Sequence, residues 1–541
     1  MLTYSLLITG KEAMVKKILI QTERNGAKKS IQTVPGASLS EILTANNIYI
    51  SAACGGRGKC GKCVVLMKSG ATPATPEDKK IFTPKQLAAG MRLSCLSVPE
   101  SDCTVVIGTG DETDFEIISE YQTPANDTAA DSRPESAYGI AIDIGTTTIA
   151  VNLVGMDSKK VLDTVTTINR QRAFGADVIA RIQASVAGRG AELKKSVCED
   201  LYRCIAAITS RNPVNPKSIR AVTIAGNTTM GHLLMGYSCK TLGVVPFTPV
   251  NIDTTRVTFA ELFSVIPDAD PAFGAIPVIL LPGISTYVGA DIAAGLLTCG
   301  FDKNEEICLL IDLGTNGEMA VGNSGRILCT STAAGPAFEG GNITCGMGSV
   351  AGAICSVAIG GGDIRLTTIG NKPPIGLCGT GVIETTYELL KNELIDETGM
   401  LDEDYFDDGY ILGKTPDGKD IFFSQKDIRE IQLAKSAVRA GVETLLLRYG
   451  ITYDDIAHVY LAGGFGYRID LHKAVGIGML PSELEDRITA VGNSSLGGAT
   501  HYLTDPEAPA RIQSIVDVCT EISLSTDKDF MQLYTEHMFF E

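Results

Sequence analysis

Residues 138–154 read YGIAIDIGTTTIAVNLV, and residues 309–322 read LLIDLGTNGEMAVG. Each stretch predicts a buried strand, a turn of glycine and threonine, and a second strand. A third strand is expected after each, and both copies continue to a buried strand that ends in small residues, AVTIAGN at 221–227 and HVYLAGG at 458–464. Two copies of one βββ-plus-βα unit predict a duplicated domain with a cleft between its halves.

The whole chain is predicted to be a multi-domain α/β protein. Its 541 residues exceed what a single hydrophobic core usually holds, and its 44% of hydrophobic residues suits a compact fold. A clean strand pattern begins at Met14. The expected order is an N-terminal extension at 1–13, a small cysteine-bearing domain at 14–108, an acidic flexible linker at 109–137, and the two halves of the duplicated domain at 138–300 and 301–541.

Charge and hydropathy exclude two classes of partner. The net charge of −17 lacks the basic footprint of a nucleic-acid-binding protein. No run of about 20 apolar residues is free of charges and turn signals, so no membrane span is expected. The opening MLTYSLLITGKEAM lacks the features of a signal peptide. Fifteen cysteines in a chain without an export signal predict a reducing compartment, the cytoplasm.

The charge is distributed unevenly along the chain. Residues 14–108 contain thirteen Lys and Arg against six Asp and Glu, whereas residues 109–137 contain one Arg against eight acids. A small basic module is therefore tethered to a large acidic body. Such an asymmetry favours electrostatic docking.

The spacing of three cysteines in the small domain predicts a metal centre. Cys54, Cys60 and Cys63 are separated by five and two residues, and Cys95 follows after 31 more. Three cysteines on one loop with a remote fourth are typical of 2Fe–2S clusters of the plant and adrenodoxin types. The glycines of the loop would let the backbone approach the cluster and direct N–H groups at its sulfurs. Hairpin, helix, cysteine loop and final strand follow the order of a β-grasp ferredoxin.

Two alternatives to this ligand set were weighed. Zinc more often uses two C-x2-C pairs, which favours iron and sulfide here. Cys103 is the nearby competitor of Cys95 for the fourth position, but it lies within the predicted strand CTVVIG. Arg57, Lys59 and Lys62 stand at the rim of the loop, where a redox partner would approach.

The two Asp-x-Gly-Thr turns of the duplicated domain predict a polyphosphate site. Asp143 and Asp312 end buried strands, and the turns after them offer N–H groups and hydroxyls to phosphate oxygens. The paired aspartates suit Mg²⁺, held mainly through water. The phosphate-holding residues are expected to be Gly145, Thr146, Thr147, Gly314, Thr315 and Asn316.

These motifs resemble the phosphate-1, phosphate-2 and adenosine motifs of the actin, sugar kinase and Hsp70 superfamily of ATPases. The resemblance implies ATP as the nucleotide, with Gly463 and Gly464 of Ala462-Gly463-Gly464-Phe465-Gly466 packing on the nucleoside. It also implies a ribonuclease H-like fold for each half. Asp143 and Asp312 would position Mg²⁺ and the attacking water, and Glu318 and Glu339 are two candidates for the base.

The combination of a cluster domain, an acidic linker and a duplicated ATPase resembles the reductive activators of corrinoid proteins in methyltransferase and O-demethylase systems. The resemblance implies an iron–sulfur oxidoreductase that hydrolyses ATP. It would take an electron from a low-potential donor such as ferredoxin or flavodoxin and pass it through the 2Fe–2S cluster to Co(II) of a corrinoid protein, which restores Co(I). The family also suggests a homodimer.

Two other functions stay open on the residues. One is an ATP-dependent electron donor to a different low-potential enzyme, although the known dehydratase activators share a 4Fe–4S cluster between subunits. The other is a non-enzymatic redox sensor in which the state of the cluster alters nucleotide binding.

Overall fold

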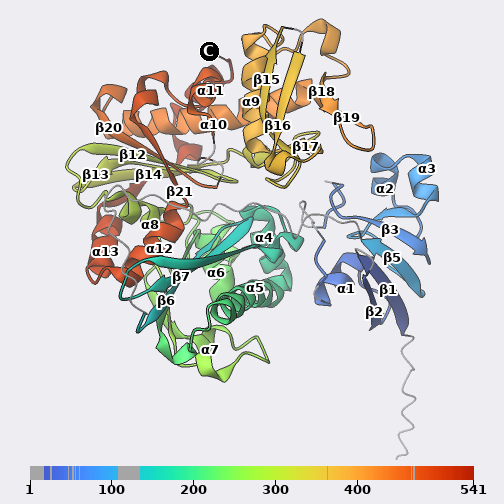
Figure 1. Cartoon of the computed structure of the whole chain (residues 1–541), viewed down its shortest axis with the longest axis horizontal. Helices are drawn as coiled ribbons and strands as arrows, with labels where there is room; N and C mark the ends of the chain where they lie inside the picture. Colours follow the sequence, from blue (N-terminus) through green and yellow to red (C-terminus); the bar gives the residue numbers. More distant parts are fainter. Residues whose placement is uncertain are drawn as a thin grey trace, which may run out of the picture. The chain divides into compact units, whose positions relative to one another are not determined.

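The computed structural model describes residues 17–24, 27–46, 48–50, 54, 56–59, 61–107, 135–361, 363–464, 466 and 469–540. The chain forms two compact units (Figure 1): Met1–Gly110 with Gln171–Arg181, and Asp111–Arg170 with Ile182–Glu541. The predicted extension at 1–13, most of the predicted linker at 109–137, and Cys60 lie outside the described residues.

The small unit is built on a five-stranded sheet of order β2-β1-β5-β3-β4. β1 and β2 form the predicted antiparallel hairpin, and β5 pairs with β1 in parallel. Ser38 and Glu41 form a capping box at the start of α1, whose apolar face closes the core over the sheet. The order of a β-grasp ferredoxin is confirmed. Its elements are β1 (Ile18–Arg24), β2 (Ala27–Thr33), α1 (Leu39–Ala45), β3 (Val64–Ser69), α2 (Pro76–Ile81), α3 (Pro84–Ala88), β4 (Met91–Leu93) and β5 (Cys103–Ile107).

The first half of the large unit contains a six-stranded sheet of order β10-β11-β9-β6-β7-β8. β6, β7 and β8 form an antiparallel meander, and β9 pairs with β6 in parallel, as the βββ-plus-βα pattern predicted. The strands are β6 (Tyr138–Ile144), β7 (Thr148–Gly155), β8 (Val161–Ile168), β9 (Ile219–Gly226), β10 (Thr255–Thr258) and β11 (Pro277–Leu280). The helices are α5 (Gly190–Arg211), α6 (Thr228–Met235), α7 (Phe259–Leu262) and α8 (Ala290–Cys299). Before them, α4 (Val178–Ala184) begins in Gln171–Arg181, the segment grouped with the small unit.

The second half repeats this arrangement in a sheet of order β21-β20-β12-β13-β14-β22. β12, β13 and β14 form the meander, and β20 pairs with β12 in parallel. The strands are β12 (Ile307–Leu313), β13 (Gly317–Asn323), β14 (Arg326–Thr332), β20 (Ile456–Ala462), β21 (Ile488–Gly492) and β22 (Cys519–Glu521). The predicted duplication is confirmed, since β6, β7, β8 and β9 correspond in order and direction to β12, β13, β14 and β20.

A smaller α/β layer is inserted between β14 and β20 (Figure 1). Its apolar side chains share one core with the second sheet. Its elements are β15 (Ala353–Gly360), β16 (Asp363–Thr368), β17 (Gly376–Leu377), α9 (Gly379–Lys391), β18 (Tyr410–Lys414), β19 (Asp420–Phe423) and α10 (Gln425–Tyr449). The remaining helices are α11 (Leu471–Gly476), α12 (Ser494–Thr504), α13 (Ala508–Val518) and α14 (Phe530–Glu536). Across the described ranges, no helix combines the length and the apolar composition needed to cross a membrane.

Helices α8 and α12 cross at very short range between the two sheets. A Cβ atom on Gly498 would lie 2.1 Å from the backbone oxygen of Ala294, so only glycine permits this approach. α12 comes late in the chain, yet it packs on the first sheet, where the Thr223 hydroxyl donates to the Ala499 carbonyl at 2.8 Å. Side chains of both sheets and both helices form one hydrophobic core. This crossing brings the N-termini of α8 and α12 to the ends of β6 and β12.

Candidate functional site

The cysteines of the small unit meet where β3 begins and β4 ends. Cys63 precedes β3 and Cys95 follows β4, and the antiparallel pairing of these strands brings their Sγ atoms to 3.2 Å. Cys54 is partly buried and near enough for its charge to raise the pKa of Cys95. The fourth predicted ligand, Cys60, lies outside the described residues.

Thiol contact explains the ionisation of this pair. The hydrogen bond between the two thiols lowers the pKa of Cys63 to about 6. The same hydrogen bond, together with burial, raises the pKa of Cys95. A thiolate is the form that binds iron. Cys63 is therefore predisposed to act as a ligand, and Cys95 would give up its proton on binding iron.

Glycines shape the loop as the sequence predicted. Gly56, Gly58 and Gly61 have φ values of +83°, +70° and +67°, which L-residues with side chains rarely adopt. A Cβ on Gly58 would lie 2.4 Å from Leu96 Cδ1, and the Gly58 N–H lowers the pKa of Cys95 by hydrogen bonding. This backbone fits a cluster whose sulfurs accept N–H hydrogen bonds.

Cys103 has a different environment from the loop cysteines. It lies in β5 opposite Ile20 of β1, only 3% exposed, in the core under α1. Cys63 and Cys95 belong to a separate apolar cluster with Phe82 and Leu93. Burial raises the pKa of Cys103 to about 11, which keeps this thiol protonated. Cys103 is a core residue in this structure.

In the large unit, Asp143 and Asp312 occupy equivalent positions at the ends of β6 and β12. α12 orients Asp143: the Ser495 hydroxyl donates to Oδ1 at 2.7 Å, and Asn493 Nδ2 donates to Oδ2 at 2.9 Å. Neither Asn493 nor Ser495 was predicted from the sequence.

Two further carboxylates, which the sequence analysis did not place beside the aspartates, complete an acidic group. Asp291 lies at the start of α8, and Glu318 lies on β13 directly opposite Asp312. Burial, followed by the charges of Asp291 and Asp143, raises the pKa of Asp312 to about 8. Burial likewise raises the pKa of Asp291 to about 7, with a smaller contribution from Asp143. Burial and the charges of Asp291 and Asp312 also raise the pKa of Glu318.

Within the described part of the chain, no basic side chain pairs with this group. Among the ion pairs of the described residues, none involves Asp143, Asp291, Asp312 or Glu318. Nor do the described residues contain three or more His, Cys, Asp or Glu side chains close enough to bind a metal ion directly. The arrangement suits a hydrated divalent cation, whose remaining ligands would be water and phosphate oxygens.

Each of the two predicted phosphate turns is closed by a backbone hydrogen bond from its glycine, over three residues in the first turn and over two in the second. The Gly145 N–H donates to the Thr148 carbonyl and the Gly314 N–H to the Asn316 carbonyl, each at 2.9 Å. Asn227, at the start of α6, supports the first turn by donating from Nδ2 to Thr146 Oγ1 at 3.1 Å. In the second turn, the Asn316 side chain donates to Glu318 at 3.2 Å.

One carboxylate connects the two turns across the halves. Glu339 Oε2 accepts hydrogen bonds from Thr147 Oγ1 at 3.4 Å and from Thr315 Oγ1 at 3.1 Å. Burial raises the pKa of Glu339, and the two threonines partly oppose this. Glu339 thus occupies the position where both turns would present hydroxyls to a phosphate group.

The predicted nucleoside-binding glycines follow β20. Gly463 has φ +94°, and a Cβ there would lie 2.2 Å from the Leu313 carbonyl and 2.8 Å from Asp312 Oδ1. Gly463 therefore lets the chain pass directly beside Asp312. Gly464 is exposed with open space before it, and the neighbouring Phe465 lies outside the described residues.

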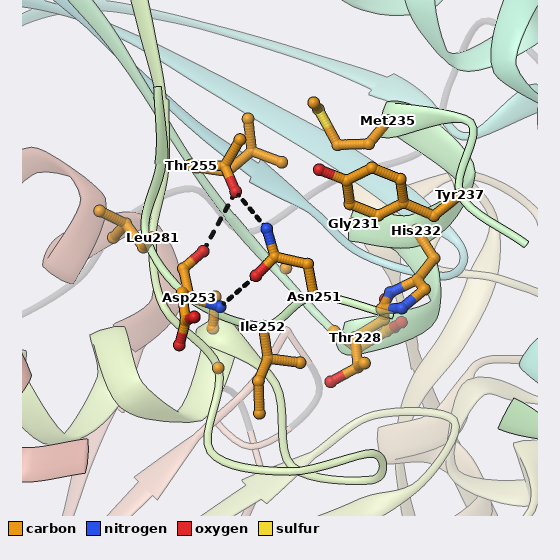
Figure 2. A pocket seen from close by; sticks show the side chains of 15 residues that line it. Thr228, Gly231, His232, Met235, Tyr237, Asn251, Ile252, Asp253, Thr255 and Leu281 are labelled. Carbon is orange, nitrogen blue, oxygen red and sulfur yellow. Dashed lines mark hydrogen bonds between the residues drawn. The ribbon is translucent and has the colours of Figure 1, made fainter. Parts of the chain in front are cut away.

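A small pocket is lined by residues of α6 and of the loop around Asn251 (Figure 2), and Asn227 is also part of its lining. Its polar side chains bond mainly to one another: Asn251 donates to Thr255 at 3.1 Å and accepts from the Asp253 N–H at 2.8 Å. His232 is buried, with its ring nitrogens bonded to the Thr228 carbonyl and the Val250 N–H. These contacts stabilise the loop that follows α6.

The acidic group predicts an unusual pH dependence of stability. Because the folded state holds protons on Asp291 and Asp312 up to pH about 7 and 8, it binds more protons than the unfolded chain above pH ~4. The free energy of unfolding should therefore fall as pH rises from 5 to 8. Asp312→Asn should reduce this slope and raise Tm at pH 8 by a few degrees, since about 1 kcal/mol moves Tm by roughly 2 °C in large domains.

Thermal unfolding between pH 5 and 8, with and without Mg²⁺ and nucleotide, checks this prediction. Bound Mg²⁺ should flatten the slope in the unmodified protein and have little effect in the variant. An unmodified protein whose Tm falls with pH no more steeply than that of Asp312→Asn would contradict it.

Comparisons with known proteins agree with this architecture. Three family models match the chain: a 2Fe–2S iron–sulfur cluster binding domain over residues 22–100, the middle region of RACo over 138–304, and the C-terminal ASKHA domain of RACo over 306–541.

Relatives match most of the chain. The corrinoid activation enzyme RamQ of Eubacterium limosum is 29% identical, over 93% of this chain and 96% of the relative. The [Co(II) methylated amine-specific corrinoid protein] reductase of Methanosarcina barkeri is 25% identical, over 73% and 76%. Among solved structures, a reductive activator for corrinoid,iron-sulfur protein aligns with a TM-score of 0.68 and 28% identity, over 96% of this chain and 98% of that one.

Proposed function

This chain belongs to the family of reductive activators of corrinoid proteins, and on that premise we propose that it uses ATP to drive the one-electron reduction of Co(II) to Co(I) in a corrinoid protein. The observation that carries the proposal is the presence in one chain of a ferredoxin-type cysteine site and a duplicated body with paired phosphate turns. A cluster can transfer electrons without a nucleotide site, and a nucleotide site can hydrolyse ATP without a cluster. Together they are suited to a reduction that needs an energy source.

The cysteine site fits a 2Fe–2S cluster, which when bound would supply one-electron chemistry near −400 mV. Cys54, Cys60, Cys63 and Cys95 would hold it, and the Gly58 N–H would stabilise charge on the sulfur of Cys95. Each 59 mV by which the reduction potential of the acceptor lies below that of the donor lowers the equilibrium constant of a one-electron transfer about tenfold. A Co(II)/Co(I) couple below the cluster therefore requires a coupled source of free energy.

ATP acts on conformation in this proposal, because it has no orbital role in moving the electron. Asp143, Asp291 and Asp312 would hold hydrated Mg²⁺, while Gly145, Thr146, Thr147, Gly314, Thr315 and Asn316 would bind phosphates. Gly463 and Gly464 would pack on the nucleoside. The product is ADP and phosphate, and no small molecule is phosphorylated.

The direct test mixes the anaerobic protein with ATP, a low-potential reductant and candidate Co(II) corrinoid proteins, while the corrinoid spectrum is recorded. Conversion to Co(I) that requires ATP supports the proposal. ATPase activity is measured in parallel with and without the corrinoid protein. ATP turnover that responds only to the redox state of the cluster would indicate a sensor, and reduction of a different enzyme in place of the corrinoid would indicate a general electron donor.

We further propose that Glu339 is the base that accepts a proton from the attacking water. Its Oε2 lies within hydrogen-bond distance of both phosphate turns, and burial raises its pKa, which makes it a stronger base than an exposed carboxylate. Glu339→Gln keeps the size of the side chain and removes its basicity. The kcat for ATP hydrolysis should fall roughly 100-fold, while KM for ATP should change less than about threefold.

Steady-state ATP hydrolysis by Glu339→Gln, beside an equilibrium titration with a non-hydrolysable ATP analogue, checks this role. A large rise in KM with unchanged kcat would show that Glu339 only holds the two turns together. Glu318→Gln identifies the base if its kcat falls and that of Glu339→Gln does not.

A further inference from the structure

The small unit carries a group of exposed basic side chains around its cysteine loop. Three belong to the loop and three to the short helices α2 and α3, and all are solvent-exposed. α2 lies against the loop, because a Cβ on Gly61 would lie 3.5 Å from Ile81 Cγ2 and one on Gly58 3.3 Å from Glu77 Cγ. We name this group the basic collar, and its members are Arg57, Lys59, Lys62, Lys79, Lys80 and Lys85.

The charges of the collar are not used within the unit. Among the described residues, no ion pair or side-chain hydrogen bond involves its five lysines, and Arg57 donates from Nε to the Cys54 carbonyl at 2.8 Å. Two other basic residues of the unit do have partners: Lys68 pairs with Glu23 at 3.0 Å, and Arg92 is buried and donates to backbone carbonyls.

The acids near the loop do not offset the collar. Asp78 is buried and accepts from the Leu93 N–H at 2.8 Å and from Thr75, so it has a structural role. Glu77 is partly buried against Gly58. The surface over the cysteines is therefore strongly positive, with Ile81, 38% exposed, and the partly buried Leu96 as apolar contacts within it.

We infer that the basic collar is the docking surface for the electron donor, a small acidic low-potential redox carrier protein. This inference rests on the proposed function. The reduced carrier would lose one electron and an oxidised cluster held by the cysteine site would gain it, with no bond made or broken and no proton moved. A positive rim around an apolar centre suits brief encounters with a negatively charged partner, whose association it accelerates.

The test compares two double variants of the full-length holoprotein with equal changes of charge. Lys79→Glu/Lys80→Glu alters the collar. Lys17→Glu/Lys28→Glu, the matched control, alters exposed lysines at β1 and β2, and β2 is the edge of the sheet opposite β4. The probe is a reduced acidic ferredoxin, and stopped-flow absorption follows reduction of the cluster at low and high salt.

The second-order rate constant at low salt should fall about tenfold or more in the collar variant and stay within about twofold in the control. High salt should lower this rate constant in the unmodified protein and have little effect on it in the collar variant. Equal losses in both variants, or a rate of the unmodified protein that does not depend on salt, would overturn the inference.

A second measurement separates this inference from the proposed function. Fully reduced protein is mixed with ATP and a Co(II) corrinoid protein, and the collar variant should match the unmodified protein. If this step slows while the ferredoxin step does not, the collar contacts the corrinoid protein and the inference is wrong. If no protein reduces the corrinoid, the proposed function fails, while the ferredoxin measurement still decides the inference.

Discussion

Asp312→Asn should lower ATP-dependent corrinoid reduction by at least about 100-fold while leaving the visible absorption of the cluster unchanged. Asp312 ends β12 beside Gly463 and directly opposite Glu318, in a group of carboxylates that has no basic partner among the described residues. Bound Mg²⁺ would offset the repulsion among these carboxylates. Asparagine preserves the shape and removes the charge, so Mg²⁺·ATP should bind without being aligned for hydrolysis.

ATP hydrolysis, corrinoid reduction and the cluster spectrum are measured on the same preparation. Asp408→Asn is the control, because Asp408 is exposed in the loop before β18. Loss of both the cluster and the reduction in Asp312→Asn would contradict the expectation that the two sites fold independently. Full activity in Asp312→Asn would remove Asp312 from the nucleotide site.

Cys95→Ala should abolish the cluster and with it all electron transfer, while nucleotide binding persists. The Sγ of Cys95 contacts that of Cys63, and the Gly58 N–H is directed at it, so no other side chain can replace it as a ligand without rebuilding the loop. Iron and sulfide content, visible absorption and ATP-analogue affinity are the measurements.

Cys103→Ala is the matched control, since it removes a thiol of the same unit from the core of the sheet. It should keep the cluster and lose about 1 kcal/mol of stability. A cluster that survives Cys95→Ala and disappears in Cys103→Ala would reverse the assignment of the fourth ligand. Zinc in the anaerobically prepared protein would contradict the cluster itself.

The repeated elements could be predicted from the sequence because they depend on local patterns. The alternation of apolar residues, the Gly-Thr turns and the positions of Asp143 and Asp312 all lie within single strand–turn–strand segments. The cysteine loop could be predicted for the same reason, since its cysteines follow a characteristic spacing.

The parts that the sequence analysis missed depend on distant segments meeting in space. Asp291 begins an otherwise apolar helix, and that isolated acid in GADIAAG was the available signal. Asn493 and Ser495 reach Asp143 only because α12 packs on the first sheet, 350 residues later in the chain. The double contact of Glu339 with Thr147 and Thr315 likewise has no local signature.

The crossing of α8 and α12 has a consequence for how this body can be divided. Cutting the chain near residue 300 would remove α12 from the first sheet, on which it packs. In the second fragment, the apolar face of α12 and its glycine contact with α8 would be exposed to water. Neither fragment should therefore be stable or bind nucleotide on its own. The two repeated halves therefore form one interlocked unit where α8 and α12 cross.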